Sequence, residues 1–279
     1  MVYRARLAER YDRSSLDTML WTAIVASLGL LSVLVTGALY TTSKTLNAPD
    51  LVVLWATGHR HAGEAGGALG LLLFGLIAWK QPKVRKLAWG LCAGVIAQAG
   101  LGSVPLGPLG GAVHAILAQC LVAGAVGVAV ALSKTWAAEP QIIEDYGWPS
   151  LRSLSISLPT LIALQIALGA FFRQGLMGLM PHVIGAMLVS MFIMMVGAFV
   201  LQQCKHHKVL SAAGKRLLTT TFLQVFLGIA IFTYRSMPTS PVGIVLGLAA
   251  AHVATGALLL AAAVTLGMHI RRNVVPKKA

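Results

Sequence analysis

The stretch from residue 182 to residue 201, HVIGAMLVSMFIMMVGAFVL, contains 20 residues and no charged side chain. The hydrocarbon core of a bilayer is about 30 Å thick and needs roughly 20 apolar residues in a helix. This stretch is therefore long enough to cross a membrane as a single helix. It also begins with His182, a side chain that is costly to place in a span unless it has a partner.

Similar apolar runs recur along the chain and are separated mostly by short polar connectors. Hydrophobic residues make up 57% of the chain and charged residues only 11%, which lies outside the usage of soluble domains. We expect eight membrane-spanning helices, at residues 18–40, 59–79, 87–101, 112–132, 153–172, 182–201, 217–233 and 244–268. The expected fold class is therefore an all-α integral membrane protein.

The longest connector divides the expected helices into two halves. It reads SKTWAAEPQIIEDYGWPS over residues 133–150 and contains two prolines and three acidic residues. We expect two pseudo-symmetric four-helix bundles. The N-terminal bundle covers residues 1–136, a cytoplasmic connector covers 137–152, and the C-terminal bundle covers 153–279.

The distribution of basic residues predicts the orientation, because an even number of spans places both termini on one side. The basic residues on that side are Arg4, Arg6, Arg10, Arg13, Lys80, Lys83, Arg85, Lys86, Lys205, Lys208, Lys215, Arg216, Arg271, Arg272, Lys277 and Lys278. Only Lys44, Arg60, Arg173 and Arg235 fall opposite. The positive-inside rule then predicts a multi-pass protein of the cell (inner) membrane with both termini in the cytoplasm. The net charge of +14 is explained by this topology, so the lipid bilayer and not nucleic acid is the expected partner.

A short motif repeats in the odd-numbered expected spans, and a histidine repeats in the even-numbered ones. The motif is Gln-x-x-Leu-Gly, and its glycines permit close helix approach; it begins at Gln98, Gln165 and Gln224. The histidines lie at the outer ends of the even spans: His59 or His61, then His114, His182 and His252. The two halves of the sequence therefore resemble one another.

Four histidines at one depth in a membrane protein predict metal ligands. Two helices of one bundle can each present an imidazole to the same iron, and apolar side chains around them can accept a porphyrin. Pairing within each half predicts two bis-histidine haem sites. A single histidine near a span end more often reaches toward water or bonds a carbonyl group, but the fourfold repetition favours ligation. Zinc or non-haem iron is disfavoured, because only Glu64 supplies a nearby carboxylate.

The other polar residues near the span ends allow two interpretations. Arg60 and Arg173 lie at the outer ends, where a guanidinium could pair with haem propionates or could simply extend to the membrane interface. His206, His207 and His269 lie among basic residues at the opposite ends, and we interpret them as solvated or lipid-facing side chains.

These motifs, in this order, resemble those of the haem A synthase family. Gly58-His59-Arg60 is similar to that family's span-two motif, and His114-Ala-Ile-Leu-Ala-Gln119 to its span-four motif. The segment QIALGAFFR at residues 165–173 resembles span five. The segments HVIGA at 182–186 and HVATGA at 252–257 resemble spans six and eight, and the resemblance covers all eight spans.

The resemblance implies a fold of two four-helix bundles and an enzymatic activity. It implies that His182 and His252 hold haem b as a cofactor, and that His59 and His114 bind the substrate haem O. The C8 methyl group of haem O would be hydroxylated twice and lose water to give the formyl group of haem A. The resemblance also implies a haem O synthase and an electron acceptor as partners, and it leaves a homo-oligomer open.

Two positions depart from the family pattern. The family has a glutamate three residues before the span-two histidine, where this chain has Ala56, and many bacterial members have a cysteine pair in the first outer loop, where TTSKTLNAPD has none. We therefore predict catalytic roles for Glu64 and His61, which are three residues apart and so share a helix face. His61 is alternatively the span-two ligand in place of His59. A non-catalytic haem or electron carrier on the same fold is the rival function.

Overall fold

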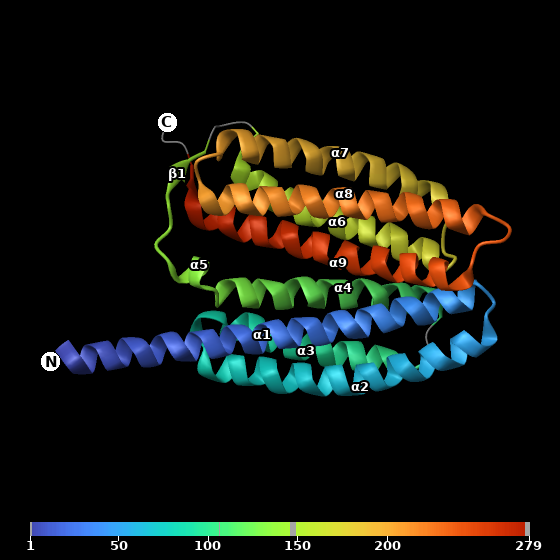
Figure 1. Cartoon of the computed structure of the whole chain (residues 1–279), viewed down its shortest axis with the longest axis horizontal. Helices are drawn as coiled ribbons and strands as arrows, with labels where there is room; N and C mark the ends of the chain where they lie inside the picture. The colour runs from blue at the N-terminus through green and yellow to red at the C-terminus, as the bar shows by residue number, and fades with distance from the viewer. Residues whose placement is uncertain (1, 106, 146–148, 277–279) are drawn as a thin grey trace.

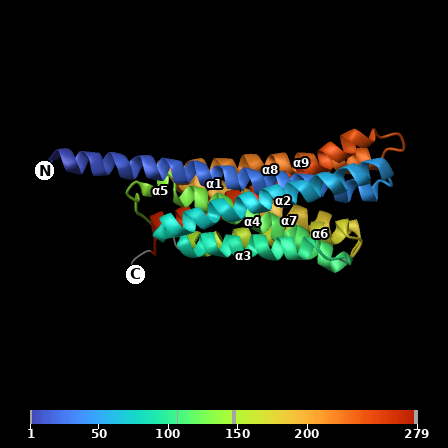
Figure 2. The same cartoon turned by 90° about the horizontal axis from the view of Figure 1, so that it is seen from below.

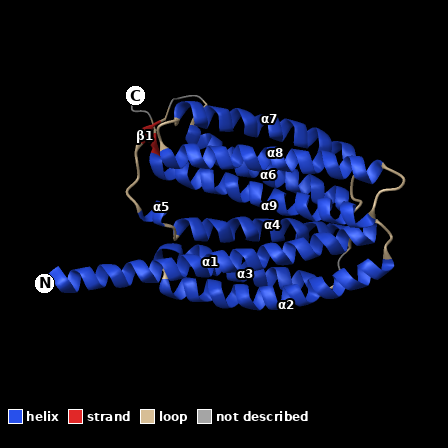
Figure 3. Ribbon diagram, in the orientation of Figure 1, coloured by secondary structure: helices blue, strands red, loops and turns tan. Residues whose placement is uncertain are grey.

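The computed structural model describes residues 2–105, 107–145 and 149–276, with side chains from Leu16 onward, and this part of the chain is almost entirely helical. The helices are α1 Val2–Thr45, α2 Pro49–Lys80, α3 Arg85–Gly102, α4 Pro108–Ala131, α5 Lys134–Ala137, α6 Leu151–Arg173, α7 Leu179–Gln203, α8 Lys208–Ser236 and α9 Val242–Asn273. A 3₁₀ turn, Pro82–Val84, precedes α3. Two short strands, β1 Ile143–Glu144 and β2 Val274–Val275, pair in parallel (Figure 3).

Seven helices within the described residues are long and apolar enough to cross a membrane. They are Leu16–Thr45 of α1 together with the whole of α2, α4, α6, α7, α8 and α9. Helix α3 occupies the place of the expected span 87–101 but is not one of the seven. It has only 18 residues, and these include Arg85, Lys86 and Gln98, whereas each longer helix contains a stretch of this length that is more apolar. The chain is an all-α, multi-pass membrane protein.

The structure corrects several of the predicted helix ends. Helix α2 begins at Pro49 and not at residue 59, and α8 begins at Lys208 and not at residue 217. Hydropathy locates the apolar centre of a span, whereas a helix continues for as long as its backbone hydrogen bonds are made. Pro49 suits the first turn of α2, because the first N–H groups of a helix have no intrahelical acceptor. His59 therefore lies within α2 and does not open it.

The long helices run side by side along one axis in both views (Figures 1 and 2). Helices α1 and α3 each pack against α2 and α4, and α6 and α8 each pack against α7 and α9. Helices α4 and α9 also pack against each other. Small residues allow that contact: Gly127 of α4 faces Met268 of α9, and Ala257 of α9 is fully buried against α1–α4, which we call the first group of helices, while α6–α9 form the second group.

The start of α1 and the end of α9 lie at the same end of the molecule, which we call the terminal end (Figure 1). The connector between α4 and α6 also lies there, and it is folded against α8 and α9. The Gln141 backbone N–H donates to Asn273 Oδ1 at 3.0 Å, and His207 Nε2 donates to the Gln141 carbonyl at 3.0 Å. Asp145 accepts from the Leu151 N–H at 3.0 Å and so caps α6. Lys277, Lys278 and the side chains of Arg4, Arg6, Arg10 and Arg13 lie outside the described residues.

Candidate functional site

The structure brings four histidines together in two pairs near the end opposite to the terminal end. His59 of α2 faces His114 of α4, with ring centroids 6.3 Å apart and ring planes at 90°. His182 of α7 faces His252 of α9, with centroids 6.4 Å apart and planes at 84°. All four side chains are partly buried. The two halves of the chain therefore contain the same arrangement.

A glycine on the preceding helix lies against each imidazole ring. A Cβ atom added at Gly37 or Gly169 would lie 2.9 Å from Cε1 of His59 or His182. The corresponding distances are 3.3 Å for Gly102 and His114, and 3.1 Å for Gly228 and His252. Three of these glycines end the Gln-x-x-Leu-Gly motifs. The motif therefore makes room for the ring of the next helix, because any larger residue would push the imidazole out of its position.

The glutamine of each motif contacts the same ring. The amide nitrogen of Gln98 is 3.1 Å from His114 Nε2, that of Gln165 is 3.0 Å from His182 Nδ1, and that of Gln224 is 3.2 Å from His252 Nε2. Gln98 and Gln165 also donate to the backbone oxygen of their histidine, at 3.1 Å and 2.8 Å. These glutamines orient the histidines and do not merely join helices.

Helix α1 contains the fourth copy of this arrangement, which the sequence pattern did not reveal. Gly37 fills the glycine position, but Val33 stands where the motif has glutamine. Thr36, one residue before the glycine, places its hydroxyl oxygen 3.1 Å from His59 Nδ1. In the sequence, Gly37 could have indicated this fourth copy. The copy was not recognised because residue 33, four positions earlier, is valine and not glutamine.

Several polar atoms at the two pairs are buried and have no hydrogen-bond partner among the described residues. They are Oε1 of Gln98, Gln165 and Gln224, and Nδ1 of His114 and His252. Buried polar atoms are rarely left unpaired unless a ligand, an ion or water completes the site. Both histidine pairs therefore have buried polar atoms that are free to contact a bound group.

The ring separation is compatible with two ligands on one metal ion. With metal–nitrogen bonds of about 2 Å and an imidazole radius of about 1.1 Å, two rings that face one ion have centroids about 6 Å apart. The observed 6.3 Å and 6.4 Å are close to this value. Among the described residues, no group of three or more His, Cys, Asp and Glu side chains converges on one point.

The remaining predicted site residues lie apart from the facing rings. Glu64 accepts from Arg60 Nε at 3.1 Å and lies 3.4 Å from His61 Nδ1, so the predicted contact between His61 and Glu64 is present. All three side chains are exposed: Arg60 by 80%, His61 by 71% and Glu64 by 59%. His59 and His61 point to different sides of α2, because two residues correspond to about 200° around a helix.

Arg173 extends from the end of α6 to α1. Its Nη2 atom donates to the Ala38 backbone oxygen at 3.0 Å and to Thr42 Oγ1 at 3.1 Å. Ala38 follows Gly37, the glycine that lies against His59. Arg173 thus connects the second group of helices to the part of α1 that holds the first pair.

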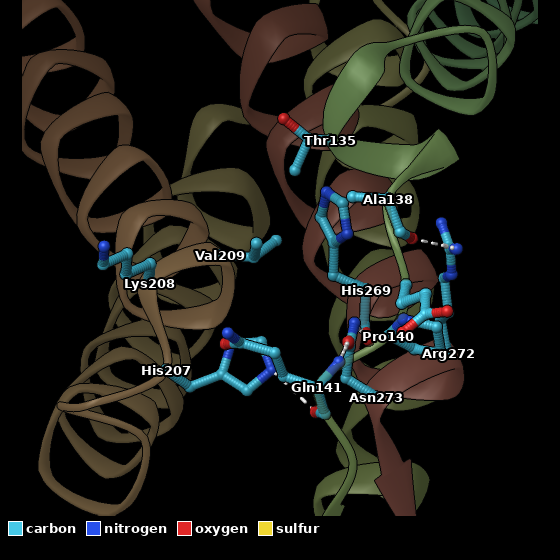
Figure 4. Close-up of a pocket in the computed structure, with 11 residues that line it drawn as sticks. Thr135, Ala138, Pro140, Gln141, His207, Lys208, Val209, His269, Arg272 and Asn273 are labelled. Carbon is cyan, nitrogen blue, oxygen red and sulfur yellow. Dashed lines mark hydrogen bonds between the residues drawn. The ribbon is translucent and has the colours of Figure 1, made fainter.

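A second polar cluster lies in a cleft at the terminal end (Figure 4). His207 and His269 line this cleft and are only 5% and 6% exposed, so their interpretation as solvated or lipid-facing side chains is wrong. His207 accepts from the Leu210 N–H at 3.2 Å and caps α8, while the His269 ring packs against Trp136 with centroids 5.5 Å apart. These contacts hold the connector in place.

A scan against protein-family models found no match, and a search of curated proteins found none either.

Proposed function

We propose that this chain is an eight-span membrane haem protein, built as two pseudo-symmetric four-helix bundles with one bis-histidine site in each. The two facing histidine pairs, with nearly equal centroid distances of 6.3 Å and 6.4 Å, carry this proposal. Two imidazoles on opposite sides of an iron are a common axial ligand set of haem, and apolar helices suit the porphyrin. The unpaired Nδ1 atoms of His114 and His252 support the same conclusion.

The eighth span in this proposal is α3. It lies between α2 and α4 and packs against both, so it has the neighbours of a transmembrane helix although it is short. Its basic first turn, with Arg85 and Lys86, is an interfacial anchor. In this proposal the terminal end faces the cytoplasm of a cell (inner) membrane, and the excess of basic residues there supports this orientation.

Within this arrangement we assign haem b to His182 and His252, and the substrate haem O to His59 and His114. These assignments, and the activity of a haem A synthase, follow the sequence resemblance. Haem b supplies one-electron redox chemistry when it is bound. The glutamines Gln165 and Gln224 orient its two ligands. Loss of such a partner of a ligating histidine typically costs about 10- to 100-fold in metal affinity or activity.

Oxidation of a methyl group releases protons, and the proposal assigns their final transfer to water, outside the facing rings, to Glu64 and His61. The two side chains form a contact of 3.4 Å, are exposed, and lie on the helix that carries His59. A carboxylate beside an imidazole can accept a proton and pass it to water. Arg60, also bonded to Glu64, holds the carboxylate in place and is available to a propionate at the edge of the site.

Extraction of the bound pigment tests the haem proposal. Purified protein should show the spectrum of a low-spin, bis-histidine haem, and His182→Ala or His252→Ala should remove the signal of the second pair. Haem O or haem A together with haem B would support the enzyme. A normal low-spin spectrum in both variants would exclude these two residues as ligands.

Activity is tested in a host that makes haem O but lacks its own haem A synthase. Haem A should accumulate with the unchanged chain and fall with Glu64→Gln and with His61→Ala. If the unchanged chain makes haem A and both variants match it, the proton role of Glu64 and His61 is wrong. If the unchanged chain makes none, the enzymatic function itself is wrong.

One observation favours the rival function, a non-catalytic bis-histidine haem or electron carrier. Ala56 replaces the family's glutamate, and among the described residues no carboxylate is hydrogen-bonded to His59 or His114. A carrier needs the ligands but no acid or base beside them. Haem B alone in the extract, with no haem A in the expression host, would establish this function.

A further inference from the structure

The cleft at the terminal end is lined by groups that the proposed function does not use. It lies between the start of α8, the end of α9 and the connector, and its volume is about 170 Å³ (Figure 4). A water molecule needs about 10–15 Å³ of such space, whereas the pocket of a drug-sized molecule has at least about 300 Å³. The cleft therefore has room for a small chemical group.

His269 of α9 supplies the cleft with a buried ring whose nitrogens are unused. The side chain is only 6% exposed, and within the described part of the chain neither ring nitrogen is hydrogen-bonded. Packing on Trp136 holds the ring. His207, by contrast, uses both nitrogens, because Nδ1 accepts from the Leu210 N–H and Nε2 donates to the Gln141 carbonyl. A buried imidazole without a partner is costly, so the partner of His269 is expected in the cleft that it lines.

The start of α8 adds two unpaired N–H groups to the wall of the cleft. The backbone N–H groups of Lys208 and Val209 have no acceptor among the described residues, while the next one, of Leu210, is capped by His207. Helix α8 has 29 residues, and the first N–H groups of such a helix carry a partial positive charge. Helix starts of this kind bind phosphate and other anions.

The charged side chains that line the cleft are mostly positive. They include Lys208 and Arg272, and neither forms an ion pair within the described residues. Arg272 is fixed in place, because it donates to the carbonyls of Trp136 and Ala138 and stacks on the Trp136 ring at 4.7 Å from its centroid. Glu139 is the one acid among the described lining residues, and it is exposed. The cleft therefore favours an anion over a cation.

From these groups we infer that the cleft is a phosphate-binding site. The phosphate oxygens accept from the N–H groups that begin α8, from the Lys208 ammonium and from a ring nitrogen of His269. His269 directly follows the apolar run at residues 244–268, so the cleft lies at the depth of the lipid headgroups. Basic pockets between helices at this depth bind anionic headgroups. The expected occupant is the phosphate of an anionic phospholipid, and this site is independent of the proposed haem sites.

Thermal unfolding of the full chain in dodecyl maltoside tests the site, because a ligand that binds only the folded state raises the melting temperature. Dioleoylphosphatidylglycerol should raise it, and the same amount of dioleoylphosphatidylcholine, whose headgroup has no net charge, should not. Inorganic phosphate, compared with chloride at equal ionic strength, separates the two sources of the group. A rise with the lipid alone identifies the headgroup as the occupant, and a rise with inorganic phosphate alone identifies soluble phosphate.

Three variants locate the binding within the cleft. His269→Phe keeps a ring against Trp136 but removes the nitrogens, so it should abolish the rise without lowering the melting temperature of the ligand-free protein. Lys208→Gln should weaken the apparent affinity about tenfold, as loss of a hydrogen bond to a charged group does. Lys208→Pro also removes the N–H group and should weaken it further. Proline fits there, because this residue begins α8 and His207 before it is extended.

Lys205→Gln is the matched control, because it removes an equal charge from an exposed lysine outside the described lining of the cleft. Its rise in melting temperature should equal that of the unchanged chain. The inference is overturned if neither the lipid nor inorganic phosphate raises the melting temperature, or if His269→Phe leaves the rise intact. Equal loss of the rise in Lys205→Gln and Lys208→Gln would also overturn it, since the effect would then be one of net charge.

Discussion

The Arg173 guanidinium on α6 donates to the backbone oxygen of Ala38 on α1 at 3.0 Å, across the boundary between the two groups of helices. A second bond of 3.1 Å joins the same nitrogen to Thr42 Oγ1. Ala38 adjoins Gly37, which lies against His59. One side chain of the second group therefore fixes the part of α1 that positions a ring of the first pair.

Replacing Arg173 by methionine should destabilise the protein and disturb the first pair. Removal of the guanidinium leaves the Ala38 carbonyl and the Thr42 hydroxyl without this donor, at a cost of about 2 kcal/mol. Thermal unfolding in detergent micelles measures the loss. Arg60→Met is the control, because Arg60 is 80% exposed and should leave the melting temperature unchanged. Equal melting temperatures of the Arg173 and Arg60 variants would show that Arg173 does not tie the helices together.

Alanine at the four glycines that face the histidines should weaken haem binding in a fixed order. Gly169→Ala and Gly37→Ala should have the largest effects, because the new Cβ would lie 2.9 Å from the ring. Gly228→Ala at 3.1 Å and Gly102→Ala at 3.3 Å should have smaller effects. The low-spin absorbance per mole of protein measures occupancy. Gly90→Ala is the control, since a Cβ there meets no atom within 4 Å. A loss as large in this control would refute the steric explanation.

The contact between α6 and α9 should be sensitive to one added methyl group. A Cβ at Gly267 would lie 2.8 Å from the backbone oxygen of Ser155, and backbone yields less readily than a side chain. Gly267→Ala should lower the free energy of unfolding by about 1–3 kcal/mol, as overpacking does. The same substitution at Gly243, where there is open space, should have no such effect when both variants are unfolded in parallel.

Topology reporters should place both termini and the connector on the cytoplasmic side. Lys80, Lys83, Lys205 and Lys208 lie in loops or helix ends at the terminal end, as the positive-inside rule requires. Reporter fusions after residue 279 and within the connector should both be active only in the cytoplasm. A reporter between α2 and α3 should agree with them, and one between α8 and α9 should not. A periplasmic signal from the connector or from either terminus would overturn the orientation.

The sequence alone determined that the chain is an all-helical membrane protein and located the apolar centres of its spans. This information is local, because the length and hydropathy of a run decide whether it can cross a bilayer. It also identified His114, His182 and His252 and the three glutamine motifs that serve them, and it left the fourth position open between His59 and His61. Helix ends were less predictable, as α2 and α8 show, because their polar extensions continue the helix outside the apolar core.

Only the tertiary structure decided which side chains meet. Pairing within each half was predicted, but only the structure placed His59, and not His61, opposite His114, and it showed that Thr36 takes the place of a glutamine at His59. It also directed Arg173 to α1 and buried His207 beneath the connector. These contacts join residues far apart in the chain, and they depend on the rotation and separation of packed helices. Small residues at the interfaces set that geometry, and the hydropathy of a run does not reveal it.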